Sequence, residues 1–161
     1  MKSVCFTGHR ILPKDSEKLK QKLYAELEKA VISGAIHFYS GGAVGWDTLA
    51  AWTVLQLRKV YPNIRLHLIL PCAPQEQSIK WTQDQRQIFA QIQAAADTVE
   101  QTAEHYYTGC MRLRNARLVS LADGCFCYYN PLQSRSGTGQ TVRMAVKRNL
   151  PVLNFFLDGK D

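Results

Sequence analysis

The sequence has no run of about 20 consecutive apolar residues, the length that a membrane-spanning helix needs. Its first apolar stretch stops at Thr7, too early for a secretory signal. Five cysteines, an odd number without a CxxC pair, predict no disulfide framework, and four scattered histidines predict no zinc site. Cys125 and Cys127 are expected to be small core residues of one strand. We expect a cytoplasmic protein with no metal and no membrane partner.

A long block of lysine or arginine is also absent, although the chain of 161 residues carries a net charge of +7. Basic residues that are spread out suit an anionic partner such as a nucleotide, a polyphosphate or nucleic acid, and they equally suit a soluble basic surface. The apolar fraction of 46% and the charged fraction of 20% are ordinary for a globular domain. No linker or repeat divides the chain, so residues 1–161 are expected to form one domain.

Short apolar runs alternate with amphipathic segments along the chain. Leu19, Leu23 and Leu27, for example, recur at the spacing of one helix face. Strands are expected at residues 2–8, 36–40, 64–70, 97–102, 124–129 and 151–156, and helices at 15–33, 44–60, 76–96, 109–121 and 138–149. The helix at 76–96 is expected to contact the core through Ile79, Trp81, Ile88, Phe89 and Ile92. This alternation predicts an α/β fold, with a mainly parallel sheet of about six strands and helices on both faces.

Turn-rich segments follow four of the expected strands, at residues 7–10, 40–47, 71–72 and 130–139. Ligands of parallel sheets bind beyond the carboxyl ends of the strands, so these segments should line one cleft. Arg114 is added from the helix before the fifth strand, although the spacing of Arg112 and Arg114 does not decide which one faces the cleft. The candidate ligand-binding residues are Gly8, His9, Arg10, Ser40, Gly41, Gly42, Gly45, Asp47, Arg114, Ser136, Gly137, Thr138 and Thr141.

Two of these segments, 40–47 and 136–141, combine glycines with the start of a helix, an arrangement that favours phosphate binding. Neither is a P-loop or a GxGxxG motif, and a tight turn without a ligand would also need such glycines. Arg10 is suited to clamp a phosphate, and His9 to hydrogen-bond a base or a sugar. A solvated turn would suit both residues as well.

The segments that carry a family resemblance are Phe6–Arg10, Tyr39–Gly45, Pro71, Trp81, Met111, Arg114, Asn115 and Ser136–Thr138. Together they resemble the SLOG superfamily, which includes the cytokinin-activating LOG hydrolases and the DNA-processing protein DprA. Within it, the sequence is most similar to the YpsA-like family, and the similarity covers nearly the whole chain. It implies a Rossmann-like fold that binds a nucleotide or a nucleotide-derived ligand.

The resemblance supports a shared set of binding residues more strongly than it supports a shared hydrolase activity. Arg114 matches an arginine of the LOG enzymes, and Gly137 and Thr138 match the Gly-Thr pair of their PGGxGTxxE segment. Thr141 stands where these enzymes carry their catalytic Glu. Cleavage of an N-glycosidic bond needs a carboxylate to steady the oxocarbenium-like centre or to activate water. Asp47, on a different loop, is the nearest candidate, but it equally suits a helix cap or a ribose-binding group.

Three functions therefore stay open. The first is a nucleotide-binding protein, which would suit a sensor, with no obligatory cofactor and with a nucleotide, NAD or an ADP-ribose-like molecule as the ligand. The second is a LOG-like hydrolase of nucleotides that uses Asp47. The third is a DprA-like binder of single-stranded DNA, for which stacking aromatics are required. The candidates for stacking are Trp46, Tyr106, Tyr107 and Tyr129, although a core position would suit these residues equally. A homo-oligomer is a further implication of the resemblance, because helical faces in this superfamily often pair.

Overall fold

The computed structural model describes residues 1–156, so the last five residues of the expected domain lie outside the description. Its centre is one six-stranded sheet in the order β4-β3-β2-β1-β5-β6, and every neighbouring pair of strands is parallel. This architecture confirms the predicted fold class. The strands are β1 (Ser3–Gly8), β2 (His37–Ser40), β3 (Arg65–Leu70), β4 (Thr98–Gln101), β5 (Gly124–Tyr128) and β6 (Val152–Asn154).

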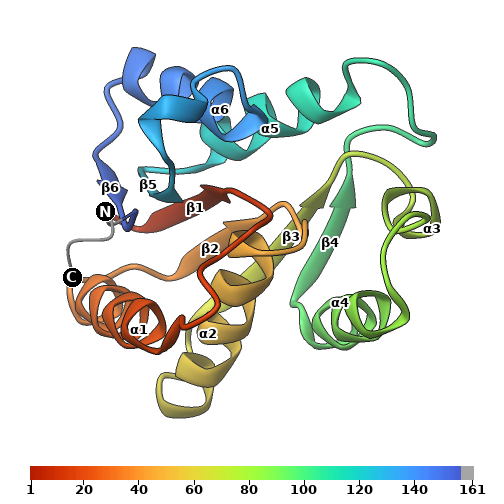
Figure 1. Ribbon diagram of the computed structural model, residues 1–161. Coiled ribbons are helices and arrows are strands. Elements are labelled where there is room, and N and C mark those ends of the chain that lie inside the picture. The colour runs from red at the N-terminus through yellow and green to blue at the C-terminus, as the bar shows by residue number, and fades with distance from the viewer. Residues whose placement is uncertain (157–161) are drawn as a thin grey trace.

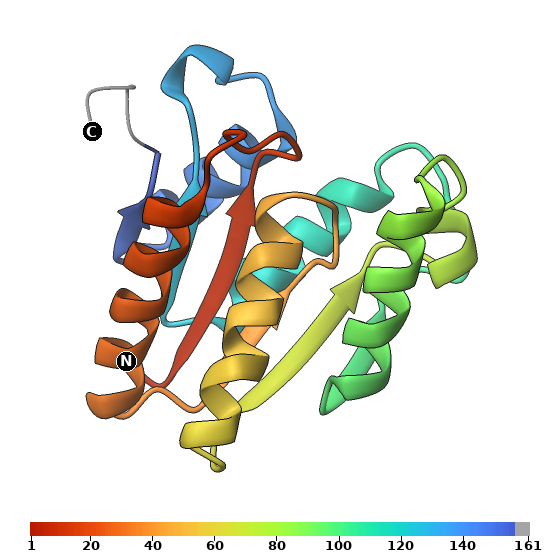
Figure 2. The same cartoon turned by 60° about the horizontal axis from the view of Figure 1, so that its bottom comes forward.

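Helices cover both faces of the sheet (Figures 1 and 2). One face carries α1 (Glu17–Ile32), α2 (Trp46–Val60) and α4 (Gln83–Ala95). The other carries α5 (Cys110–Leu121) and α6 (Gly137–Lys147), which pack against each other. A one-turn helix, α3 (Pro74–Gln77), follows β3, and a 3-10 turn, η1 (Pro131–Gln133), follows β5. Within residues 1–156, no helix combines the length and the apolar character that crossing a bilayer requires.

Two apolar clusters lie on opposite sides of the sheet. Phe6 and Phe38, on the face that α1 and α2 cover, are fully buried and stack with their ring centroids 6.2 Å apart. The cluster under α5 and α6 is built from smaller side chains, including Cys5, Cys125 and Cys127. All five cysteines are buried and unpaired. The predicted core role of Cys125 and Cys127 is therefore confirmed.

The prediction of a single helix at 76–96 is wrong, because the structure has two helices in this segment, α3 and α4. Thr82 begins a new helix, because its side chain accepts a hydrogen bond from the Gln85 amide (3.1 Å) while the Gln85 side chain accepts one from the Thr82 amide (3.0 Å). This reciprocal capping box separates α4 from α3. Ile79, in the break, is 71% exposed, and Ile88 is 41% exposed, so neither is a core residue.

We predict that Thr82→Ala lowers the free energy of unfolding by about 1 kcal/mol, because the change removes the side-chain cap of α4. Urea denaturation measures this loss. Thr108→Ala is the matched control, since Thr108 is exposed and its side chain has no hydrogen bond to the described residues. An equal effect of the two substitutions would contradict the capping role.

Candidate functional site

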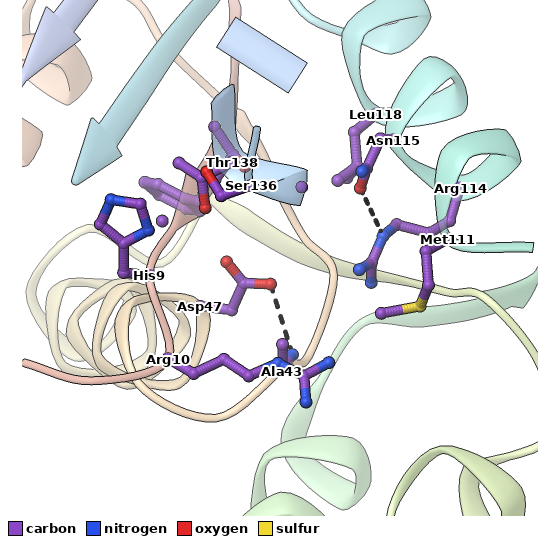
Figure 3. A pocket seen from close by; sticks show the side chains of 14 residues that line it. His9, Arg10, Ala43, Asp47, Met111, Arg114, Asn115, Leu118, Ser136 and Thr138 are labelled. Atoms are coloured by element: carbon purple, nitrogen blue, oxygen red, sulfur yellow. Dashed lines mark hydrogen bonds between the residues drawn. The ribbon is translucent and has the colours of Figure 1, made fainter. Parts of the chain in front are cut away.

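A pocket of about 360 Å³ lies at the carboxyl ends of the strands. The chain adds β2, β3 and β4 on one side of β1 and then places β5 and β6 on the other side. Such a reversal of strand order opens a crevice between the diverging loops, where α/β proteins bind their ligands. We call this cavity the switch-point pocket. It is lined by Phe6, Thr7, Gly8, His9, Arg10, Ala43, Asp47, Met111, Arg114, Asn115, Leu118, Ser136, Gly137 and Thr138 (Figure 3).

The N-terminus of α6 forms one wall of the switch-point pocket. Ser136 caps this helix, because its Oγ accepts a hydrogen bond from the Gly139 amide at 3.0 Å. The amides of Gly137 and Thr138 are the first two of the helix and have no carbonyl partner in the described chain. Unpaired amides and the positive end of the helix dipole favour an anion at this wall.

Arg114, on α5, supplies a buried positive charge at the opposite wall; its residue is only 5% exposed. Its Nη1 donates to the Gly41 carbonyl at 2.6 Å, and its Nε donates to Asn115 Oδ1 at 2.9 Å. These bonds fix the plane of the guanidinium, while Nη2 has no hydrogen bond to residues 1–156. Burial lowers the pKa of Arg114, and the nearby Asp47 carboxylate acts in the opposite direction.

Asp47 lies between these two walls, in the first turn of α2 (Figure 3). Its Oδ2 accepts a hydrogen bond from the Ala43 amide at 3.3 Å. Its Oδ1 is buried and has no partner among the described residues. Burial raises the pKa of Asp47 to about 6, and the Arg114 guanidinium limits the rise. A buried acceptor without a donor is costly, so this oxygen is suited to receive a hydroxyl group from a ligand.

His9 and Arg10 follow β1 directly and line the same pocket. Of these two side chains, only that of His9 has a hydrogen-bond partner among the described residues. His9 Nε2 accepts a hydrogen bond from the Asn130 amide at 2.9 Å, and burial lowers the pKa of this histidine. A neutral His9 therefore holds the loop after β5. Arg10 is exposed and makes no ion pair within the described residues, so its charge is available to a ligand.

The segment 40–47 is placed differently from the expected phosphate cradle. Its glycines are not part of the pocket lining, and the Gly42 amide is already bonded to Ser40 Oγ at 3.2 Å. A Cβ on Gly41 would collide with Arg114, and one on Gly45 would collide with the Arg10 backbone. The glycines thus allow the wall of the pocket to pack closely. Their contact with a phosphate stays a prediction.

Thr141 and Trp46 also lie away from the pocket lining. Thr141 is fully buried, and its hydroxyl donates to the Gly137 carbonyl at 2.9 Å. Trp46 is fully buried against Tyr128 and Phe155, so of its two open roles the structure shows the core role and not base stacking. In contrast, Tyr106 and Tyr107 are exposed.

Sequence reasoning named Asn115 as part of the family resemblance but did not include it among the candidate site residues. Asn115 orients Arg114 through the hydrogen bond to Nε. Its position directly after the arginine on one helix turn was the available signal. No group of three or more potential metal ligands is found in the part of the chain that the structure describes.

The fold and the pocket at its switch point define a Rossmann-like α/β domain. A model of the YspA SLOG family matches residues 12–152, and the chain belongs to this family. The SPbeta prophage-derived protein YoqJ of Bacillus subtilis is 29% identical, over 88% of this chain and 92% of its own length. A UPF0398 protein of Brevibacillus brevis is 31% identical over 70% of this chain and 56% of that relative.

Two solved structures share the fold. DNA processing protein A from Helicobacter pylori, described in a study of its single-stranded DNA binding, superposes with a TM-score of 0.63 at 22% identity. The match covers 95% of this chain and 64% of that one, so the chain spans slightly less than two thirds of its length. The protein TM1055 superposes with a TM-score of 0.58 at 15% identity, over 94% of this chain and 72% of its own.

We predict that Asp47 makes the folded state less stable as the pH rises from about 4 to about 6. The unfolded chain releases this proton near the ordinary pKa of 3.8, whereas the folded chain holds it until about 6. The folded state therefore binds more protons in that window, and its stability falls with rising pH. Relative to Asp47→Asn, the unfolding free energy of the wild type should fall by about 2 kcal/mol between about pH 4.5 and about pH 7.5.

Urea denaturation of both proteins at the two pH values measures this difference. The exposed Asp84, exchanged for Asn, is the matched control for a general effect of lost charge. A difference that stays constant or grows with pH would show that the folded protein does not hold the Asp47 proton.

Proposed function

We propose that this protein binds a nucleotide or a nucleotide-derived ligand in the switch-point pocket. The free amides of Gly137 and Thr138, together with Arg10 and Arg114, would hold the phosphate. Asp47 Oδ1 would accept a hydrogen bond from a sugar hydroxyl. The family membership and the shared fold are consistent with this assignment, and NAD or an ADP-ribose-like molecule would offer the same groups.

The observation that carries the proposal is a pair of buried opposite charges that do not touch. Asp47 and Arg114 are each 5% exposed and line the same cavity, yet no nitrogen of Arg114 lies within 4.0 Å of an Asp47 oxygen. Two buried ions are costly unless each is compensated by a partner. A ligand that carries both an anionic group and a hydroxyl would compensate the two at once.

We predict that Arg10→Ala weakens AMP binding about tenfold, because it removes a charged donor to the phosphate. Titration calorimetry measures the affinity. The thermal unfolding temperature should stay unchanged, since Arg10 is exposed and unpaired among the described residues. Arg86→Ala, an exposed arginine on α4 far from the pocket lining, removes the same charge and should bind AMP like the wild type.

Binding of single-stranded DNA is the second candidate, because the H. pylori protein of the same fold is described with that ligand and the net charge here is +7. The same titrations distinguish the two. Tight, strongly salt-dependent binding of oligothymidylate without any binding of AMP would replace the nucleotide proposal with the DNA one.

Hydrolysis of the nucleotide is less well supported than binding. In the described chain, Asp47 is the one carboxylate that lines the pocket, and Thr141 is engaged inside α6. We predict that no free base is released from AMP, GMP, CMP or UMP in multiple turnovers, as measured by chromatography over hours with the nucleotide in large excess over the protein. Multiple turnover that disappears in Asp47→Asn would instead identify a hydrolase with Asp47 as its catalytic carboxylate.

A further inference from the structure

A second cavity, of about 570 Å³, adjoins the switch-point pocket. We call it the side pocket. Arg10 and Met111 line both cavities, so the two are contiguous. The side pocket is otherwise formed by α3 and the turn after it, which contribute Gln77 and Trp81, and by the loop before α5, which contributes Tyr106. None of these three residues belongs to the glycine-rich segments.

The side pocket is more apolar and aromatic than its neighbour. Ile79 is 71% exposed and Tyr106 is 63% exposed, although both have large apolar surfaces. The Trp81 ring is half-buried and packs edge-on against Phe89, with the centroids 5.2 Å apart, so its position is fixed. Exposed apolar groups beside a polar pocket are typical of a site that binds the apolar part of a ligand.

The two pockets share a hydrogen-bonded wall. The Gly41 carbonyl accepts one bond from Gln77 Nε2 at 3.2 Å and another from Arg114 Nη1 at 2.6 Å. This shared acceptor fixes the side pocket relative to the buried guanidinium. Because Gln77 Nε2 is engaged, its Oε1 is the acceptor that remains, and this atom is buried without a partner in the described chain.

Tyr106 is held at the side pocket by its backbone. Glu76, on α3, accepts a hydrogen bond from the Tyr106 amide and another from His105 Nδ1 at 2.9 Å. These contacts lower the pKa of Glu76, with the Tyr106 amide as the largest cause. The loop is thereby tied to α3, while the Tyr106 ring makes no hydrogen bond to residues 1–156.

We propose that the side pocket receives the flat heterocyclic ring of a nucleotide whose phosphate lies in the switch-point pocket. The inference rests on the proposed function and extends it to a ring-binding site. Trp81 and Tyr106 provide aromatic surface, on which any base can stack. Gln77 Oε1 accepts a hydrogen bond from an N–H group at the edge of the ring. The site therefore selects a nucleotide over a sugar phosphate.

Titration calorimetry of the full chain with AMP and with ribose 5-phosphate tests this inference. The two probes share the phosphate and the sugar and differ only in the ring. We expect the wild type to bind AMP at least about tenfold more tightly than ribose 5-phosphate. Tyr106→Ala should weaken AMP binding by about fivefold or more and leave ribose 5-phosphate binding unchanged.

Tyr107→Ala is the matched control, because Tyr107 is also exposed, stands next in the chain and does not line the side pocket. Trp81→Ala should act like Tyr106→Ala. If loss of the Trp81–Phe89 contact unfolds the chain, Tyr106→Ala still tests the ring site, because Tyr106 is exposed. Equal binding of the two probes, or equal effects of the two tyrosine changes on AMP, would overturn the ring site alone. Binding of neither probe would overturn the proposed function and the ring site with it.

Discussion

The buried guanidinium of Arg114 is the constraint on which the ligand-binding end of the sheet depends. Its Nη1 reaches the Gly41 carbonyl only because residue 41 has no Cβ, which would collide with the guanidinium. The same carbonyl anchors Gln77 of α3. One acceptor thus joins α5, the turn after β2 and α3. Because residue 41 has no side chain, its carbonyl can bond both Arg114 and Gln77, and these bonds fix the two pockets relative to each other.

The order of strands and helices could be predicted from the sequence, because the spacing of apolar residues shows which face of each helix or strand is buried. The break before α4 was missed because the segment at 76–96 is rich in glutamine and other helix-forming residues. Only the Thr82–Gln85 pair marks the new start, and such a pair is visible in a sequence only when it is looked for. Ile79 was assigned to the core for the same reason, although it lies in the turn between two helices.

The candidate site was predictable in part. Gly8, His9, Arg10, Asp47, Arg114 and Ser136–Thr138 do line one pocket, because the carboxyl ends of parallel strands share an edge. The pattern Ser-Gly-Gly could not show that Ser40 Oγ would bond the Gly42 amide, and this bond removes a donor that a phosphate needs. A hydrogen bond between a side chain and its own loop has no periodic pattern in the sequence from which it could be predicted. Trp81 and Tyr106 come to the same pocket only through tertiary structure, so the side pocket had no local signal in the sequence.

The electrostatics of the pocket differ from those of a structural ion pair. A structural pair would bring Asp47 and Arg114 into direct contact, but each is instead held by its own neighbours, Ala43 and the Gly41 carbonyl. Asp47 Oδ1 has no donor among the described residues, and burial raises the pKa of this carboxyl although the Arg114 charge lowers it. Groups held in place before a ligand arrives need little reorganisation when it binds. The proposed ligand, placed between the two side chains, would compensate the unfavourable burial of both charges.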